Sequence, residues 1–271
     1  MSFKEKAIKI LNIFLWIVMI SGFFALLGFV QVEQKTILCN AIIVNIDYQN
    51  GEIFISDAEV KDEINSLYSD SLIGKPLTDI STIKITDRLL ENPYVAKVTV
   101  YSTVDGTLNV VLTQRKPILR VFNNRGQSFY IASDGQMIPL SDRYTARVPV
   151  ANGNLKEEFS LSRNLIPGMI NWDEANVVLT TFQKLYILAI YIDQDEFYKL
   201  QVDQIFVNEF WEFEIIPKVG RNVILFGGIN DIPEKFEKLT AFYNNGLKKA
   251  GWNKYKILNI KYKNQVICSK N

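Results

Sequence analysis

The sequence predicts an α+β protein made of one N-terminal transmembrane helix and two extracytoplasmic domains. Three observations support this fold class: an uncharged apolar run over residues 10–30, a β-α-α-β-β succession over residues 36–113, and a strand-rich region over residues 116–271. The strand-rich region is expected to form a mainly antiparallel β domain with flanking helices. A chain of 271 residues has the length of two such domains.

The apolar run is long enough to cross a membrane. Residues 10–30 carry no charge, and 21 residues at about 1.5 Å each form a helix of roughly 31 Å, the thickness of a bilayer's hydrocarbon core. Three lysines and one glutamate precede the run, whereas one acidic and one basic residue follow it closely. The positive-inside rule therefore predicts that residues 1–9 are a cytoplasmic tail and that the rest of the chain lies across the membrane.

Three other interpretations of this segment compete with an anchor. A cleaved signal peptide has a shorter apolar stretch that ends in a small-x-small motif, and no such motif follows residue 30. A lipoprotein would use Cys39, but Ile37 and Leu38 precede it where a small residue is needed. A helix of a soluble domain that is apolar on all sides has to be fully buried, which is not expected at the extreme N-terminus. A single-pass anchor is therefore the prediction.

The region after the anchor begins with a strand and a helix. Ile42–Ile46 predicts a strand, and Ser56 begins a capping box that starts a helix. Val60, Ile64 and Leu67 follow at spacings of four and three, so this helix is expected to bury one face.

A second helix and a hairpin complete this domain. The helix is expected over residues 81–91, because Asn92-Pro93 ends it. Residues 95–101 alternate like a strand, Asp105-Gly106 predicts the turn, and residues 108–112 return with apolar residues at every second position.

Short strands and turns dominate the second domain. Strands are expected over residues 118–122, 128–132, 137–140, 200–207, 211–217 and 222–226. A helix is expected to start at Asn171–Glu174 and to bury Phe182 and Leu185. Trp211 and Phe213 alternate with glutamates, which predicts a sheet with one solvent-facing side.

The C-terminus predicts a helix followed by a strand hairpin. The helix spans residues 233–250 and brings four apolar residues to one face: Phe236, Leu239, Tyr243 and Leu247. A strand over residues 257–263 is expected to point Leu258, Ile260 and Tyr262 inward, and residues 265–268 return as the last strand after a turn at Lys263-Asn264.

The last strand has one neighbour unless the chain folds back over it. Its unpaired main-chain groups then form a template for a strand of another chain. The lysines of this region, Lys261, Lys263 and Lys270, equally suit an edge that is kept solvated and unpaired. The residues alone leave both interpretations open.

The composition and the motifs argue against an enzyme. Histidine is absent and the chain has only two cysteines, so histidine triads and cysteine- or histidine-ligated metals are excluded, and no cofactor or metal is expected. Catalytic motifs in a convincing context are missing. The pairs Glu157-Glu158 and Glu212/Glu214 have the residue type of glycosidase carboxylates, but charged side chains are mostly solvated, so a solvated loop and a wet strand face are preferred. With 30 basic and 29 acidic residues, no nucleic-acid partner is expected.

Three segments carry a resemblance to a known family. Leu89–Tyr101 (LLENPYVAKVTVY) resembles the end of a POTRA domain, and it is followed by Gln114–Ile118 (QRKPI) and Tyr130–Leu140 (YIASDGQMIPL). This succession is similar to the FtsQ (DivIB) family of bacterial cell-division proteins, whose layout is a cytoplasmic tail, one anchor, a POTRA domain and a C-terminal β domain.

The resemblance implies a non-enzymatic scaffold of the division machinery, the divisome. It places the chain in the inner membrane at the division septum, with a periplasmic C-terminus. Its partners would be FtsB-like and FtsL-like membrane-anchored division proteins, with other divisome members possible at the POTRA-like domain. The family layout also separates Cys39 from Cys268, so no disulfide is expected between them.

The resemblance also implies a partner-binding site, formed by strand addition at the C-terminal edge. The matching positions are Lys261, Tyr262, Asn264, Gln265, Val266 and Ile267. Two positions depart from the family pattern: Asn259 replaces a frequent aspartate, and Lys261 replaces the usual arginine, which changes how a partner carboxylate would be bound.

Two alternative functions remain at this point. One is a POTRA-containing component of envelope protein translocation, although such proteins usually carry several POTRA repeats and a membrane barrel. The other is a membrane-tethered periplasmic hydrolase, which the motif search weakens.

Overall fold

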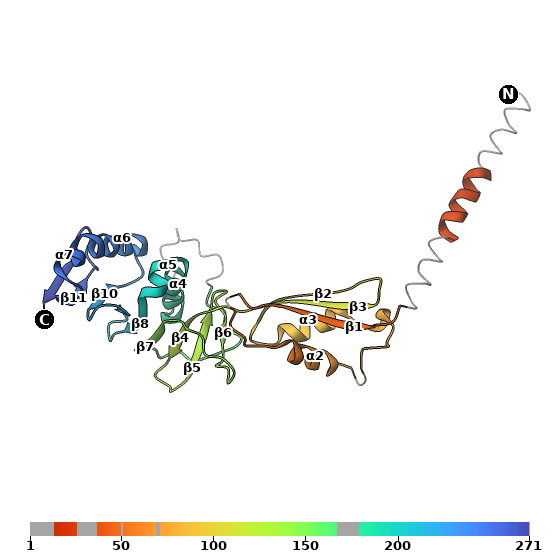
Figure 1. Ribbon diagram of the computed structural model, residues 1–271, viewed down its shortest axis with the longest axis horizontal. Helices are drawn as coiled ribbons and strands as arrows, with labels where there is room; N and C mark the ends of the chain where they lie inside the picture. Colours follow the sequence, from red (N-terminus) through yellow and green to blue (C-terminus); the bar gives the residue numbers. More distant parts are fainter. Residues whose placement is uncertain (1–13, 26–36, 50, 69–70, 167–178, 271) are drawn as a thin grey trace, which may run out of the picture. The chain divides into compact units, whose positions relative to one another are not determined.

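The computed structural model describes residues 14–25, 37–49, 51–68, 71–166 and 179–270 (Figure 1). The chain divides into two compact units. The first comprises Met1–Asp47, Ile55–Asn92 and Lys97–Leu112, and the second comprises Tyr48–Phe54, Pro93–Ala96 and Thr113–Asn271. Both units mix helices and strands, which confirms the α+β class.

The first unit has the predicted β-α-α-β-β order. Its elements are β1 (Ala41–Asp47), α2 (Asp57–Asn65), the 3-10 turn Leu77–Asp79, α3 (Thr82–Leu90), β2 (Val95–Ser102) and β3 (Thr107–Gln114). The strands form a sheet in the order β1-β3-β2, and the two helices pack together on it.

Local sequence signals set the helix ends of this unit. The Ser56 amide donates to the Glu59 carboxylate at 2.9 Å, and the Ser56 hydroxyl accepts from the Glu59 amide at 3.4 Å, so the capping box is confirmed. Val60 and Ile64 are fully buried as predicted. The prediction for Leu67 is wrong, because α2 ends at Asn65 and the Leu67 side chain is exposed.

The second unit is built on a nine-stranded sheet in the order β12-β11-β10-β9-β8-β7-β4-β5-β6. Its strands are β4 (Pro117–Phe122), β5 (Ser128–Ala132), β6 (Met137–Ile138), β7 (Val150–Gly153), β8 (Val202–Val207), β9 (Phe213–Pro217), β10 (Val223–Gly227), β11 (Tyr255–Asn259) and β12 (Ile267–Lys270). Five of the eight strand pairs are antiparallel, which confirms the mainly antiparallel sheet.

Helices complete the second unit. They are α4 (Thr181–Gln194), α5 (Glu196–Gln201), α6 (Ile232–Phe242), the π-helical turn Tyr243–Leu247 and α7 (Lys248–Ala250). Their apolar faces join the sheet in one core, in which the four residues predicted for the last helix are all buried: Phe236, Leu239, Tyr243 and Leu247. The helix start predicted at Asn171–Glu174 lies outside the described residues, and α4 begins at a capping box formed by Thr180 and Gln183.

The strand predictions differ from the structure in several places. β6 ends at Ile138 and not at residue 140. β7, which joins the two halves of the sheet in parallel pairing with both neighbours, was not predicted because four residues are too short to show alternation. Residues 200–201 end helix α5 instead of starting a strand. Trp211 has φ 57° in the β8–β9 turn, so β9 begins only at Phe213.

The predicted membrane span lies partly outside the described residues. Residues 14–25 are helical, whereas residues 10–13, residues 26–30 and the predicted tail over residues 1–9 are not described. Within the part of the chain that the structure describes, every helix is too short or too polar to traverse a bilayer.

Candidate partner-binding edge

Strand β12 forms one margin of the nine-stranded sheet, and β11 is its only neighbour among the described residues (Figure 1). The two strands are antiparallel, with Asn259 opposite Ile267 and Leu258 opposite Cys268. The predicted position of the terminal strand at a sheet edge is therefore confirmed, but its bounds are Ile267–Lys270 and not residues 265–268.

The register decides which main-chain groups of β12 point away from the sheet. The Ile260 amide donates to the Leu225 carbonyl of β10 at 3.1 Å, so on β11 the groups of Leu258 also face β10 and those of Asn259 face β12. Ile267, opposite Asn259, consequently turns its main-chain groups toward β11. Alternation then directs the amide and carbonyl of Cys268 outward.

The same alternation turns the main-chain groups of Ser269 toward β11, opposite Ile257. It ends there, because the register shifts before Tyr255 pairs with Lys270. The side chains of Ile267, Ser269 and Lys270 are exposed, and that of Cys268 is half-buried against the core. The outward amide of Cys268 is a donor and its outward carbonyl is an acceptor, so this exposed strand offers both kinds of group that an added strand would pair with.

The loop between β11 and β12 spans residues 260–266 and is tied down by side chains from elsewhere. The Lys238 ammonium of α6 donates to the carbonyl of Ile260 at 2.9 Å and also to that of Tyr262. Lys261 pairs with Glu212 at 2.9 Å. These contacts hold the loop against α6 and the β8–β9 turn without using β12.

All six residues predicted for the site lie in this loop or at the first position of β12. The turn is longer than the two residues predicted, because β11 ends at Asn259, whose side-chain oxygen accepts from the Lys261 amide at 3.1 Å. Leu258 and Ile260 are fully buried as predicted. Tyr262 is not: its side chain is 50 % exposed, since it follows the strand instead of continuing it.

Two shallow grooves run between this loop and α6. One, of about 430 Å³, is charged and lined by Lys261, Lys263, Asn264 and the acidic and basic residues of α6. The other, of about 470 Å³, is lined by Asn264, Gln265, Val266 and the π-helical turn, with Phe242 and Gly246 among its walls. Asn264, with φ 57°, borders both.

Sequence patterns missed several residues that shape this edge. Lys238 and Glu212 hold the loop, yet both look like ordinary solvated charges on a helix and a strand. Lys235 is buried, donates to the Gly228 carbonyl at 2.7 Å and lies over the Phe226 ring at 4.8 Å. Burial lowers the pKa of its ammonium. Helical spacing gave no signal for this lysine.

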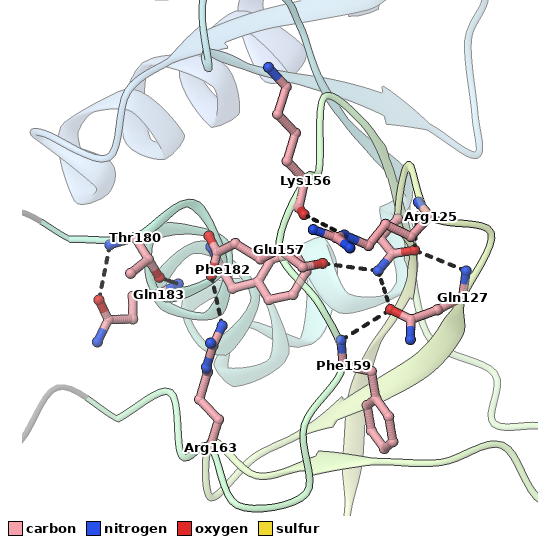
Figure 2. Close-up of polar contacts among 10 residues, drawn as sticks. Arg125, Gln127, Lys156, Glu157, Phe159, Arg163, Thr180, Phe182 and Gln183 are labelled. Carbon is pink, nitrogen blue, oxygen red and sulfur yellow. Dashed lines mark hydrogen bonds and ion pairs between the residues drawn. The ribbon is translucent and has the colours of Figure 1, made fainter.

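The carboxylates considered for a glycosidase have structural partners. In Figure 2 the Glu157 side chain accepts from the Phe182 amide at the start of α4 at 3.0 Å and from Arg163 at 3.4 Å. Glu158 pairs with Arg125. Glu157 is therefore a helix-capping residue in a packed network, not a solvated loop residue as predicted.

Both carboxylates of the second acidic pair also have structural partners. Glu212 pairs with Lys261, and Glu214 accepts a hydrogen bond from the side-chain amide of Asn208 at 3.1 Å. Among the described residues, no group of three acidic or cysteine side chains is arranged to hold a metal ion. Cys39 and Cys268 are both free thiols, and burial raises the pKa of each.

Comparison with known families identifies this architecture. A family model described as FtsQ/DivIB, C-terminal related, matches residues 116–269, which is more than half of the chain. The chain belongs to the FtsQ/DivIB-related family. A POTRA-like domain model matches residues 37–113. A search of curated proteins finds no match.

The family assignment confirms the resemblance carried by the three sequence segments. FtsQ/DivIB proteins form a non-enzymatic family of cell-division proteins. The open margin at β12 and the loop over residues 260–266 both lie in the region that the FtsQ/DivIB model matches.

Proposed function

We propose that this chain is a non-enzymatic scaffold of the divisome that binds a partner by strand addition at β12. The N-terminal segment over residues 10–30 anchors it in the inner membrane, with residues 1–9 in the cytoplasm and the two domains in the periplasm at the septum. The partner at β12 is an FtsB-like protein, itself associated with an FtsL-like protein, and the POTRA-like domain offers a second surface for other divisome members.

The observation that carries the proposal is the outward-facing main chain of Cys268 at an exposed sheet margin in a cell-division family. An added strand would satisfy these groups, while Ile267 offers an exposed apolar side chain beside it. The loop residues Tyr262 and Gln265 precede β12 in the chain, and in this proposal they border the added strand.

A single substitution tests the ladder. Cys268→Pro removes an outward amide and leaves the groups of Ile267 and Ser269 that face β11 in place, as edge positions tolerate proline. We expect binding of a purified FtsB-like protein to full-length chain in detergent to weaken at least about tenfold, because each lost ladder bond is worth roughly 1 kcal/mol and proline also blocks close approach of the added strand. The measurement is a binding titration.

Cys268→Ala is the matched control, since it removes the same thiol but keeps the amide. Binding that falls equally with Cys268→Pro and Cys268→Ala would assign the effect to the side chain, and binding that survives Cys268→Pro would contradict strand addition. Hydrogen exchange adds an independent readout: on partner binding, the amide of Cys268 should gain protection, whereas those of Ile267 and Ser269 should change little.

A further inference from the structure

One end of the first unit, around residues 37–40 just before β1, exposes several aliphatic side chains. Three aliphatic side chains are exposed there: Val104 is 86 % exposed, Ile73 59 % and Leu38 45 %. Single exposed aliphatic residues are ordinary on protein surfaces. Their grouping around one short segment, residues 37–40, is what distinguishes these three.

Hydrogen bonds place the three residues together. The Cys39 amide donates to the Lys75 carbonyl and the Gly74 amide to the Cys39 carbonyl, both at 2.8 Å. On the other side, the Asn40 amide donates to the Gly106 carbonyl at 2.8 Å. Residues 37–40 are therefore held between two turns, one with Ile73 and one with Val104, and Figure 1 shows the β2–β3 turn at the same end of this unit as the start of β1.

Both turns carry an aliphatic residue at the most exposed corner. The Lys75 amide donates to the Leu72 carbonyl at 3.1 Å, so Ile73 is the second residue of a tight turn whose third residue, Gly74, has φ 89°. The Gly106 amide likewise donates to the Thr103 carbonyl at 3.1 Å, which makes Val104 the second residue of its turn. Polar residues, glycine and proline are typical of such corners, and β-branched aliphatic residues are not.

The turns are fixed in place and not merely adjacent. A Cβ added at Gly106 would lie 2.3 Å from the Leu38 carbonyl oxygen, so the Gly106 backbone packs directly against the backbone of Leu38. The Asn40 side chain also donates to the Asp105 carbonyl at 2.9 Å. Leu38, Ile73 and Val104 thus form a rigid apolar tip.

We infer that this apolar tip rests in the lipid interface of the membrane that holds the anchor, an inference that depends on the anchor in the proposed function. Residues 31–36 separate the predicted span from the tip, and six residues reach at most roughly 21 Å when fully extended. The tip therefore stays near the bilayer surface, where exposed aliphatic side chains bury about 5–10 Å deep. The tether supplies a high local concentration, so weak insertion suffices.

The polar groups of the tip favour a zwitterionic surface over an anionic one. The Lys75 ammonium lies 5.4 Å from the Tyr68 ring centroid, and the Asp105 carboxylate accepts from the Thr107 amide at 3.1 Å. Opposite charges flank the apolar corners, so attraction to anionic headgroups is not the driving force. The lipid we specify is phosphatidylcholine.

The test uses the full chain reconstituted in phosphatidylcholine vesicles. A dansyl amino acid is introduced at Val104 or at Ile73, and its fluorescence is quenched by lipids that carry a spin label near the headgroup. The matched control is Val219, which is 54 % exposed and precedes Gly220 at φ 98° in a turn of the second unit. We expect quenching at 104 and 73 to exceed that at 219 about threefold, and Ile73→Asp to reduce it at 104.

Equal quenching at 104 and 219 in chains that float with vesicles would overturn the lipid contact while leaving the anchor intact. Quenching at 104 that requires an added partner protein would overturn it too, because the tip would then face protein. A chain that does not float with vesicles would overturn the anchor itself, and this inference with it. Binding at β12 is measured separately in detergent and is independent of all three outcomes.

Discussion

The two edge strands of the nine-stranded sheet, β6 and β12, differ in how far other residues cover them. At one margin β6 has two residues, Met137 and Ile138, and both are fully buried. Aromatic side chains cover this end, with Phe54 stacked on Tyr94 and in edge contact with Tyr130. At the other margin β12 has four residues, and three of their side chains are exposed.

An edge strand is a template for unwanted pairing unless it is short, covered or charged. β6 is short and covered, so it offers no surface to another chain. β12 is protected only by Lys270 and by the lysines of the preceding loop. The comparison shows that the sheet covers one of its edge strands and leaves the other exposed. An exposed edge strand at one margin is the pattern expected if that margin binds a partner.

Truncating one aliphatic side chain at each margin gives the largest expected difference. Ile138→Ala should lower the free energy of unfolding by about 2–4 kcal/mol, because it leaves a cavity in a packed cluster. Ile267→Ala should cost less than about 1 kcal/mol, since that side chain is 47 % exposed. Urea unfolding followed by tryptophan fluorescence measures both. Equal losses would mean that β12 is as buried as β6.

Alkaline pH should weaken the contact between helices α5 and α6, which pack in the core of the second unit. Tyr198 of α5 donates to the Phe236 carbonyl of α6 at 2.9 Å, and burial raises the pKa of this phenol to about 12. Its stabilisation is complete below pH 10, where an exposed tyrosine begins to ionise, and is lost as the pH rises through 12. The loss at pH 12 should be about 2 kcal/mol.

Tyr198→Phe is the control for this pH dependence. The variant lacks the phenol, so its unfolding free energy should fall about 2 kcal/mol less between pH 9 and pH 12 than that of the natural chain. Some dependence should persist, because burial also raises the pKa of Tyr243. The same pH slope in both chains would show that Tyr198 does not link α5 to α6 in solution.

The smallest effect is expected from the ion pair that holds the loop. Lys261 and Glu212 are 31 % and 36 % exposed, so a double-mutant cycle with Lys261→Met and Glu212→Gln should give a coupling below about 1 kcal/mol. Partner binding should respond more strongly to Lys261→Met than stability does. A coupling of several kcal/mol would instead make Lys261 a structural residue of this margin.

Much of the fold could be predicted from short-range patterns. The capping box at Ser56, the hairpin turn at Asp105-Gly106 and the buried face of the last helix all rest on contacts between residues close in the chain. The edge position of the terminal strand was also predicted, because the last strand of a hairpin has one neighbour unless the chain folds back over it. β7 was missed since its pairing is with strands that are distant in the chain.

The sequence by itself determined most of the segments that become helices, strands and turns, because hydrophobic periodicity and capping act over a few residues. Only the tertiary structure decided which groups of β12 face outward, that Tyr262 lies outside the core and that Glu157 caps a helix. Those outcomes depend on register and on partners such as Lys238 and Phe182, which lie more than twenty residues away. Local patterns carry no information about such contacts.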